Sequence, residues 1–148
     1  MKQIHLNDMY IGTNYHPHDW PETRWEQDLR LMKEAGFNVV RLGHLCWDSF
    51  EPEDSVYDFA WMDRVMDLCH DLGIGVFLDI PTRPAPVWLH KKYPSIDIVN
   101  PSGVRQNALT RYMEDVGDPD FQRYALRLAK KNGLKISRPS CPFVIWAL

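Results

Sequence analysis

The chain alternates between short apolar runs and amphipathic stretches, which indicates strands alternating with helices. Apolar runs over residues 9–13, 37–42 and 74–80 predict three buried strands. The third run, Ile-Gly-Val-Phe-Leu-Asp-Ile, is apolar almost throughout rather than at every second position. Continuous apolarity of this kind is typical of a parallel strand that is covered on both faces.

Three segments with helical spacing follow these runs. The first is predicted between Asp19, whose carboxylate would cap it, and Gly36, which would end it, with Pro21 in the first turn. Its apolar face consists of Trp25, Leu29 and Met32. The second ends at Gly73, and its apolar face consists of Trp61, Val65, Leu68 and Leu72. The third runs from about Asp120 to Lys131, with Phe121, Tyr124 and Leu128 on one face.

Strand, helix and strand repeat twice along the chain with the spacing of β-α-β crossovers, about 30 residues. This order predicts an α/β fold with a parallel sheet, either an open sheet or a (β/α)8 barrel. The connection over residues 81–119 is far longer than the usual few residues. Long connections in compact domains tend to be functional.

The C-terminal stretch differs in character from the rest of the chain. Residues 132–148 contain no acidic residue, although the preceding part contains all 20. Residues 137–142 include two prolines and show no periodicity, whereas residues 143–148 have the composition of a fourth strand. Such a strand would leave a bare hydrophobic edge, which is an aggregation hazard. We therefore expect residues 1–131 to form one structural part and residues 132–148 to be an aberrant tail.

Composition and charge narrow the class of protein. A chain of 148 residues with 45% hydrophobic and 25% charged residues fits one globular domain and not a disordered segment. A net charge of −3 without a basic run argues against a nucleic-acid partner, and no apolar stretch is long enough for a membrane span or a signal peptide. Three cysteines, without a CxxC pair or an even disulfide set, favour a reducing cytoplasmic location.

Polar and aromatic residues follow each predicted strand, where parallel α/β folds place their function. The flat faces of Tyr15, Trp47 and Trp88, beside carboxylates and arginines, suit a sugar. Packing of these rings under loops is an equally good interpretation.

Other candidate groups have simpler interpretations. His16 and His18 form an HxH pair that could bind a metal, but loop packing is favoured because no third ligand lies at a recognisable spacing. Arg41 lies near the end of an apolar strand and must be paired there, and Asp79 on the next strand is its predicted partner. Cys46 and Cys69 are expected to be buried thiols. The motifs of nucleotide-binding loops, serine hydrolases and zinc proteases are absent from the sequence.

A series of motifs resembles the opening of the glycoside hydrolase family 42 β-galactosidases. The motifs are Gly12–Pro17, Trp20-Pro21, Met32–Gly36, Glu51-Pro52, Tyr57–Phe59 and Pro81–Leu89. The likeness is collinear from about Tyr10 to Lys131, which makes it highly specific. The resemblance implies a partial TIM (β/α)8 barrel, roughly its first three βα units followed by a non-family tail.

The resemblance also implies an activity, the hydrolysis of terminal β-D-galactosides with retention in carbohydrate metabolism. The family's catalytic acid/base is a Glu that follows an Asn at the end of the fourth strand, and its nucleophile is a Glu on a later strand. No Asn-Glu dipeptide occurs in this chain, so no catalytic residue is predicted in it. The acids that remain match neither glutamate, and surface or ion-pair roles are expected for them. They include Glu51, Asp79, Glu114, Asp115 and Asp118.

By the same resemblance, Arg111 corresponds to an arginine that contacts the sugar. Asp115 stands where some members carry a zinc-binding Cys, so we expect no metal and no other cofactor. The implied partner is a small-molecule β-galactoside, and full-length members are often trimers.

The likeness ends abruptly after Lys131, and our hypothesis is that a frameshift, genuine or a sequencing error, is the cause. Residues 136–148 can be encoded by codons that, read one base later, give a stretch resembling the family's approach to its fourth strand. We expect the nucleotide sequence, read in that frame past residue 148, to continue into Asn-Glu and more barrel. A frame that does not continue in this way would contradict the hypothesis.

The sequence therefore predicts a β-galactosidase-like glycoside hydrolase that is present as a truncated fragment, inactive alone. The alternative is a non-catalytic carbohydrate-binding or interaction remnant that uses Tyr15, Trp47, Trp88 and Arg111. A free-standing α/β enzyme of another class is disfavoured, because the sequence shows no other catalytic constellation.

Overall fold

The computed structural model describes residues 9–106, 113–135 and 144–147. The chain forms two compact units, which are described separately. Residues 1–44, 59–80 and 135–148 form the first, here called the sheet unit, and residues 45–58 and 81–134 form the second, the connection unit. The connection unit thus consists of the segments that leave the second and third strands.

The sheet unit is built on four parallel strands in the order β1-β2-β3-β4. The strands are β1 (Gly12–Asn14), β2 (Val39–Leu42), β3 (Gly75–Asp79) and β4 (Val144–Ala147). In the register of the sheet, Val40 lies between Thr13 and Val76, and Val76 is paired in turn with Val144. The parallel arrangement predicted from sequence is confirmed, and so is the strand expected from composition alone near the C-terminus.

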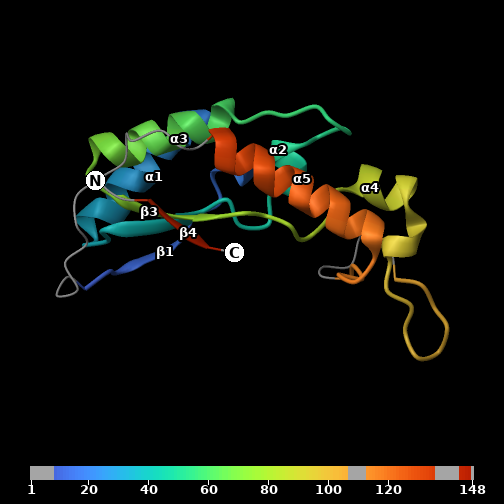
Figure 1. Ribbon diagram of the computed structural model, residues 1–148. Helices are drawn as coiled ribbons and strands as arrows, with labels where there is room; N and C mark the ends of the chain where they lie inside the picture. The colour runs from blue at the N-terminus through green and yellow to red at the C-terminus, as the bar shows by residue number, and fades with distance from the viewer. Residues whose placement is uncertain (1–8, 107–112, 136–143, 148) are drawn as a thin grey trace. The chain divides into compact units, whose positions relative to one another are not determined.

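Helices α1 (Glu22–Glu34) and α3 (Ala60–Asp71) lie side by side over one face of the sheet (Figure 1). Alternate strand residues point to opposite faces, and one alternating set has no exposed surface. This set is Val40, Leu42, Val76 and Leu78. The fully buried Leu29 of α1 and Met62, Val65 and Cys69 of α3 complete the core of the sheet unit.

Two details of the helices differ from the sequence-based predictions. Asp19 does not cap α1 but ends a short 3-10 helix, η1 (Pro17–Asp19), and Pro21 is the N-cap residue rather than part of the first turn. On α3 the buried residues are Trp61, Met62, Val65, Met66 and Cys69. Leu68 and Leu72 are only half-buried, because Leu68 borders the open groove between α1 and α3 rather than the sheet.

The predicted ends of both helices are confirmed. Gly36 follows α1 and Gly73 follows α3, each with a positive φ, 89° and 63°. A residue just past a helix end commonly adopts this left-handed conformation, which glycine accepts without a steric penalty.

The connection unit contains α2 (Trp47–Phe50), α4 (Val87–Lys92), a 3-10 helix η2 (Pro94–Ile96) and α5 (Pro119–Lys135). The long connection after β3 is therefore not a structureless loop. Its later part is also tied by antiparallel bridges between Asp97 and Glu114 and between Val99 and Arg105. Among the described residues, no helix has the length and apolarity needed to cross a membrane.

Helix α5 confirms the third predicted helix, with longer bounds. The Asp118 carboxylate caps its first turn by accepting hydrogen bonds from the backbone N–H groups of Asp120 (2.8 Å) and Phe121 (3.1 Å). Its predicted apolar face, formed by Phe121, Tyr124 and Leu128, is buried. The ring of Phe121 meets Trp47 of α2 edge-on, with 6.1 Å between centroids.

Gly43, directly after β2, offers a test of the sheet geometry. It has a φ of 81°, and a Cβ at this position would lie 2.8 Å from the backbone oxygen of Asp79. We expect Gly43→Ala to destabilise the folded chain by about 1–3 kcal/mol more than Gly36→Ala, measured as the free energy of unfolding in urea. Gly36 is the matched control, because its φ is 89° but no atom lies within 4 Å of a Cβ there. Equal effects of the two substitutions would contradict a tight approach of β2 and β3.

Candidate functional site

In the sheet unit, candidate chemistry gathers beyond the carboxyl ends of β1, β2 and β3. The buried Asp79 carboxylate, at the end of β3, accepts hydrogen bonds from Arg41 Nε at 2.9 Å and from His44 Nδ1 at 3.0 Å. A second guanidinium nitrogen of Arg41, Nη2, lies 2.5 Å from the other carboxylate oxygen of Asp79. The predicted Arg41–Asp79 ion pair is therefore confirmed, and His44 is an additional partner.

Two further imidazoles lie at the same edge of the sheet. The ring centroid of His16 is 5.9 Å from that of His44 and 5.6 Å from that of His18. The His18 ring lies in turn 5.7 Å from Trp61, at the start of α3. The HxH pair is thus part of a ring cluster. With Asp19 it is also the one group in the described residues whose ligand atoms are close enough to hold a metal.

Tyr15, predicted to face a sugar, is almost fully buried in the sheet unit. Its hydroxyl donates to the Asp28 carboxylate at 3.2 Å. Burial, with the negative charge of Asp28, raises the pKa of Tyr15, so the hydroxyl stays protonated. The hydroxyl of Tyr15 thus links the segment after β1 to α1.

The sheet face opposite α1 and α3 carries a shallow hollow of about 410 Å³. Alternate residues of three strands line it, namely Gly12, Asn14, Val39, Arg41 and Phe77, together with Tyr10 and Thr13. Gly12 is required here, because a Cβ would lie 1.8 Å from the backbone oxygen of Val39. Arg41, which has 40% of its side chain exposed, therefore links the hollow to the buried Asp79.

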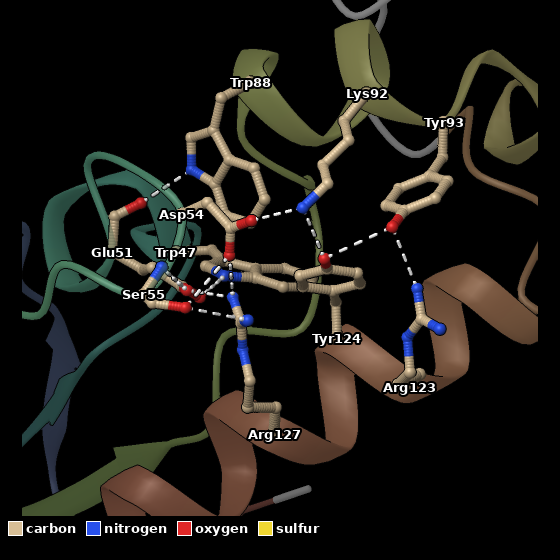
Figure 2. Close-up of polar contacts among 10 residues, drawn as sticks. All are labelled: Trp47, Glu51, Asp54, Ser55, Trp88, Lys92, Tyr93, Arg123, Tyr124 and Arg127. Carbon is tan, nitrogen blue, oxygen red and sulfur yellow. Dashed lines mark hydrogen bonds and ion pairs between the residues drawn. The ribbon is translucent and has the colours of Figure 1, made fainter.

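In the connection unit, a buried carboxylate organises the loop after β2. Glu51 has no exposed surface and accepts hydrogen bonds from Trp47 Nε1 (3.1 Å) and from the backbone N–H of Ser55 (3.0 Å). The Arg127 guanidinium of α5 forms an ion pair with the same carboxylate (Figure 2). The expected ion-pair role of Glu51 is confirmed, and no part of it is at the surface.

Trp47 and Trp88 are both anchored by Glu51. Trp47 has no exposed surface, and Trp88 is half-buried with its Nε1 donating to the backbone oxygen of Glu51 at 2.9 Å. The Trp88 ring also meets Tyr124 edge-on at 5.6 Å. The structure thus gives Trp47 a packing role, whereas Trp88 keeps part of its ring exposed. A sugar-facing role of these rings stays a prediction.

Basic side chains gather around Tyr124 on α5. The Arg127 guanidinium stands over the Tyr124 ring, 4.2 Å from its centroid, and Lys92 donates to the Tyr124 hydroxyl at 2.9 Å. Lys92 and Arg127 both form ion pairs with Asp54, at 2.5 and 2.9 Å (Figure 2). Although burial acts to raise the pKa of Tyr124, the hydrogen bonds from Lys92 and Tyr93 lower it below its ordinary value.

Glu114 organises the connection after β3 in the way that Glu51 organises the loop after β2. It is buried and accepts hydrogen bonds from the backbone N–H of Ala85 (2.7 Å) and from Arg83 Nε (3.2 Å). His90 Nε2 lies 3.8 Å from the same carboxylate, and its Nδ1 is bonded to Asp97.

The remaining candidate residues lie elsewhere. Of the other predicted acids, Asp115 is exposed and Asp118 caps α5. Arg111 and Cys141 lie outside the described residues, whereas Cys46 and Cys69 are buried as predicted.

The pairing of these acids limits their chemistry. In the described part of the chain, every buried carboxylate has a cationic or imidazole partner: Glu51 with Arg127, Asp79 with Arg41 and His44, and Glu114 with Arg83 and His90. For Glu114, burial acts to raise the pKa, but hydrogen bonds from His90, Ala85 and Arg83 outweigh it and lower the pKa, which makes this carboxyl a poor proton donor at neutral pH. The ion pairs of all three carboxylates are suited to holding loops in place.

Comparison with known proteins points to one family. The model of glycoside hydrolase family 42, described as beta-galactosidase, matches residues 14–134. Beta-galactosidase BgaB of a Geobacillus species is 41% identical over 99 residues, which are 67% of this chain and 15% of that protein. Beta-galactosidase BgaA of Clostridium cellulovorans is 36% identical over 129 residues, covering 79% of this chain and 20% of the relative.

Solved structures give the same result for the fold. The β-galactosidase of the psychrophilic Marinomonas ef1 aligns with a TM-score of 0.86 at 25% identity, over 93% of this chain and 21% of that one. A catalytic mutant of Gan42B, a family 42 β-galactosidase from G. stearothermophilus, aligns with a TM-score of 0.84 at 29% identity, over 91% of this chain and 20% of that one. The prediction of a partial (β/α)8 barrel is confirmed, and the chain spans about 15–20% of the length of these curated relatives.

The His90 cluster predicts a pH dependence of stability. Burial acts to lower the pKa of His90, but its hydrogen bonds to Glu114 and Asp97 outweigh this and raise it above the ordinary value. Protonated His90 therefore stabilises the folded chain fully below about pH 6.5, and this stabilisation is lost as the pH rises through the raised pKa of His90. We expect the free energy of unfolding to fall over this alkaline range in the wild-type chain and to fall less in His90→Asn.

The matched control for this experiment is His70→Asn, which alters an exposed histidine on α3. It is expected to keep the wild-type slope of stability against pH. An identical slope in His90→Asn would show that protonated His90 contributes nothing to the folded state.

Proposed function

The chain belongs to glycoside hydrolase family 42, and from that membership we propose that it forms the first part of a β-galactosidase catalytic barrel acting on terminal β-D-galactosides. The observation that carries the proposal is the match of residues 14–134 to the family, joined to a TM-score of 0.86 with a β-galactosidase structure. The substrate class is a small-molecule β-galactoside, and the setting is carbohydrate metabolism.

The proposed contribution of this chain is positioning of the sugar rather than bond cleavage. Retaining hydrolysis needs two carboxyl groups about 5–5.5 Å apart, one free to act as nucleophile and one able to donate a proton. The buried acids Glu51, Asp79 and Glu114 are committed to ion pairs, which supports their exclusion from both roles. Arg111 is the proposed sugar-binding residue, and the half-buried Trp88 is the best placed of the aromatic candidates.

The 148-residue polypeptide is therefore proposed to be inactive alone. Residues 1–131 are assigned to the family barrel and residues 132–148 to a tail of different composition, within which β4 pairs with β3. A cytoplasmic location is proposed from the cysteine content, because three cysteines without a CxxC pair or an even disulfide set suit a reducing compartment. Trimeric assembly is proposed only for the full-length enzyme.

A chimera tests the proposed function. Residues 14–131 of this chain replace the aligned segment of the Clostridium cellulovorans relative, which supplies the rest of the barrel. We expect the folded chimera to hydrolyse a chromogenic β-galactoside, and the 148-residue chain to show no turnover once host enzyme has been removed. Arg111→Ala in the chimera is expected to lower kcat/KM by about 100-fold, the scale of a lost charge-assisted contact.

Lys91→Ala, which alters an exposed residue of α4, is the matched control and should leave kcat/KM unchanged. Robust hydrolysis by the purified 148-residue chain would contradict the positioning role. A folded chimera without activity would contradict the assignment of this segment to a galactoside-cleaving barrel. Galactose-dependent thermal stabilisation of the 148-residue chain would instead favour a carbohydrate-binding remnant.

A further inference from the structure

The segment that leaves β1 brings together three side chains with metal-binding atoms. His16, His18 and Asp19 each offer one such atom, and these three atoms all lie within 4.8 Å of one another. The two histidines are half-buried and Asp19 is exposed. The sequence pattern alone lacked a recognisable third ligand, and the structure supplies it, because η1 turns Asp19 back toward the HxH pair.

One of the three separations is close to that in a tetrahedral zinc site. Zinc–ligand distances of 2.0–2.1 Å place neighbouring ligand atoms of a tetrahedron about 3.4 Å apart. Nε2 of His18 already lies 3.7 Å from Oδ1 of Asp19. The three ligand atoms lie at most 4.8 Å apart, so each separation would have to close by at most about 1.4 Å.

The backbone of the segment is already fixed in the required turn. Pro17, between the two histidines, is buried and has a restricted φ. The backbone N–H of Asp19 donates to the His16 oxygen at 3.2 Å, and that of Trp20 donates to the Pro17 oxygen at 3.0 Å. The contact with Trp61 further limits rotation of the His18 ring. Such preorganisation lowers the entropy that a metal would otherwise lose on gathering its ligands.

We propose that His16, His18 and Asp19 form a binding site for a divalent transition metal of the zinc class. Two imidazoles and one carboxylate are ligands of this class, and three protein ligands leave one position for water. A further imidazole, His44, has its ring centroid 5.9 Å from that of His16 and its Nδ1 hydrogen-bonded to Asp79. Metal-binding histidines commonly hydrogen-bond to a carboxylate through their other ring nitrogen, so His44 is the side chain that would replace the water. This site goes beyond the proposed galactoside hydrolysis and does not depend on it.

The test uses the 148-residue chain, stripped of metal with a chelator and titrated with Co²⁺ alone. Binding of one Co²⁺ per chain with the visible absorption of a tetrahedral site is expected, and Zn²⁺ should displace it. We expect Asp19→Asn and His18→Asn each to raise the Co²⁺ dissociation constant at least about tenfold. His70→Asn, at an exposed histidine of α3, is the matched control and should leave it unchanged.

Asp19→Asn decides the outcome if His18→Asn disturbs folding, as judged by circular dichroism, because Asp19 lies at the surface. Absence of Co²⁺ binding by the wild-type chain would overturn the proposal. An unchanged dissociation constant in Asp19→Asn would also overturn it, and the histidines would then be a packing cluster only. Activity of the chimera does not enter either criterion, so failure of the metal site and failure of the proposed function are distinguishable.

Discussion

The described parts of the chain depend on one constraint, that a carboxylate removed from water must be neutralised where it lies. Asp79 meets it in the sheet unit through Arg41 and His44, which ties the carboxyl ends of β2 and β3 together. Glu51 and Glu114 meet it in the connection unit through Arg127 and Arg83. Loss of one partner from such a pair typically costs about 3–5 kcal/mol, since a charge is left buried without compensation. The loops are therefore held by charge pairing as much as by apolar contact.

The sequence predicted those features that depend on local pattern or on neighbouring strands. Parallel strands place their carboxyl ends together, so the pairing of Asp79 with Arg41 is predictable from the sequence. The Glu51–Arg127 pair could not be assigned, because its partners lie 76 residues apart on a loop and a helix. The buried face of α3 was predicted only in part, because periodicity gives the spacing of apolar positions but not which of several adjacent rows meets the sheet.

The residues of the candidate site likewise separate into those whose role the sequence predicts and those whose role it does not. Trp47 and Tyr15 resemble sugar-stacking residues in sequence, because both lie after strands among polar neighbours. Their polar atoms are nevertheless engaged inside the protein, the indole of Trp47 with Glu51 and the hydroxyl of Tyr15 with Asp28. A spacing of four residues between Trp47 and Glu51 was the available signal, since residues so spaced lie on one side of a helical turn. The role of Arg111 comes from family resemblance, which local chemistry alone does not provide.

The use of acids for stability supports the positioning role that we propose for this part of a barrel. A general acid needs a pKa near the working pH, which is obtained by burying a carboxyl group away from cations or near a second carboxylate. Pairing with arginine has the opposite effect and favours the ionised form. A segment that uses Asp79, Glu51 and Glu114 to fix its strands and loops holds these carboxylates in ion pairs. The positioning role proposed for this segment follows from that use, since the two carboxyls of a retaining glycosidase act as nucleophile and proton donor.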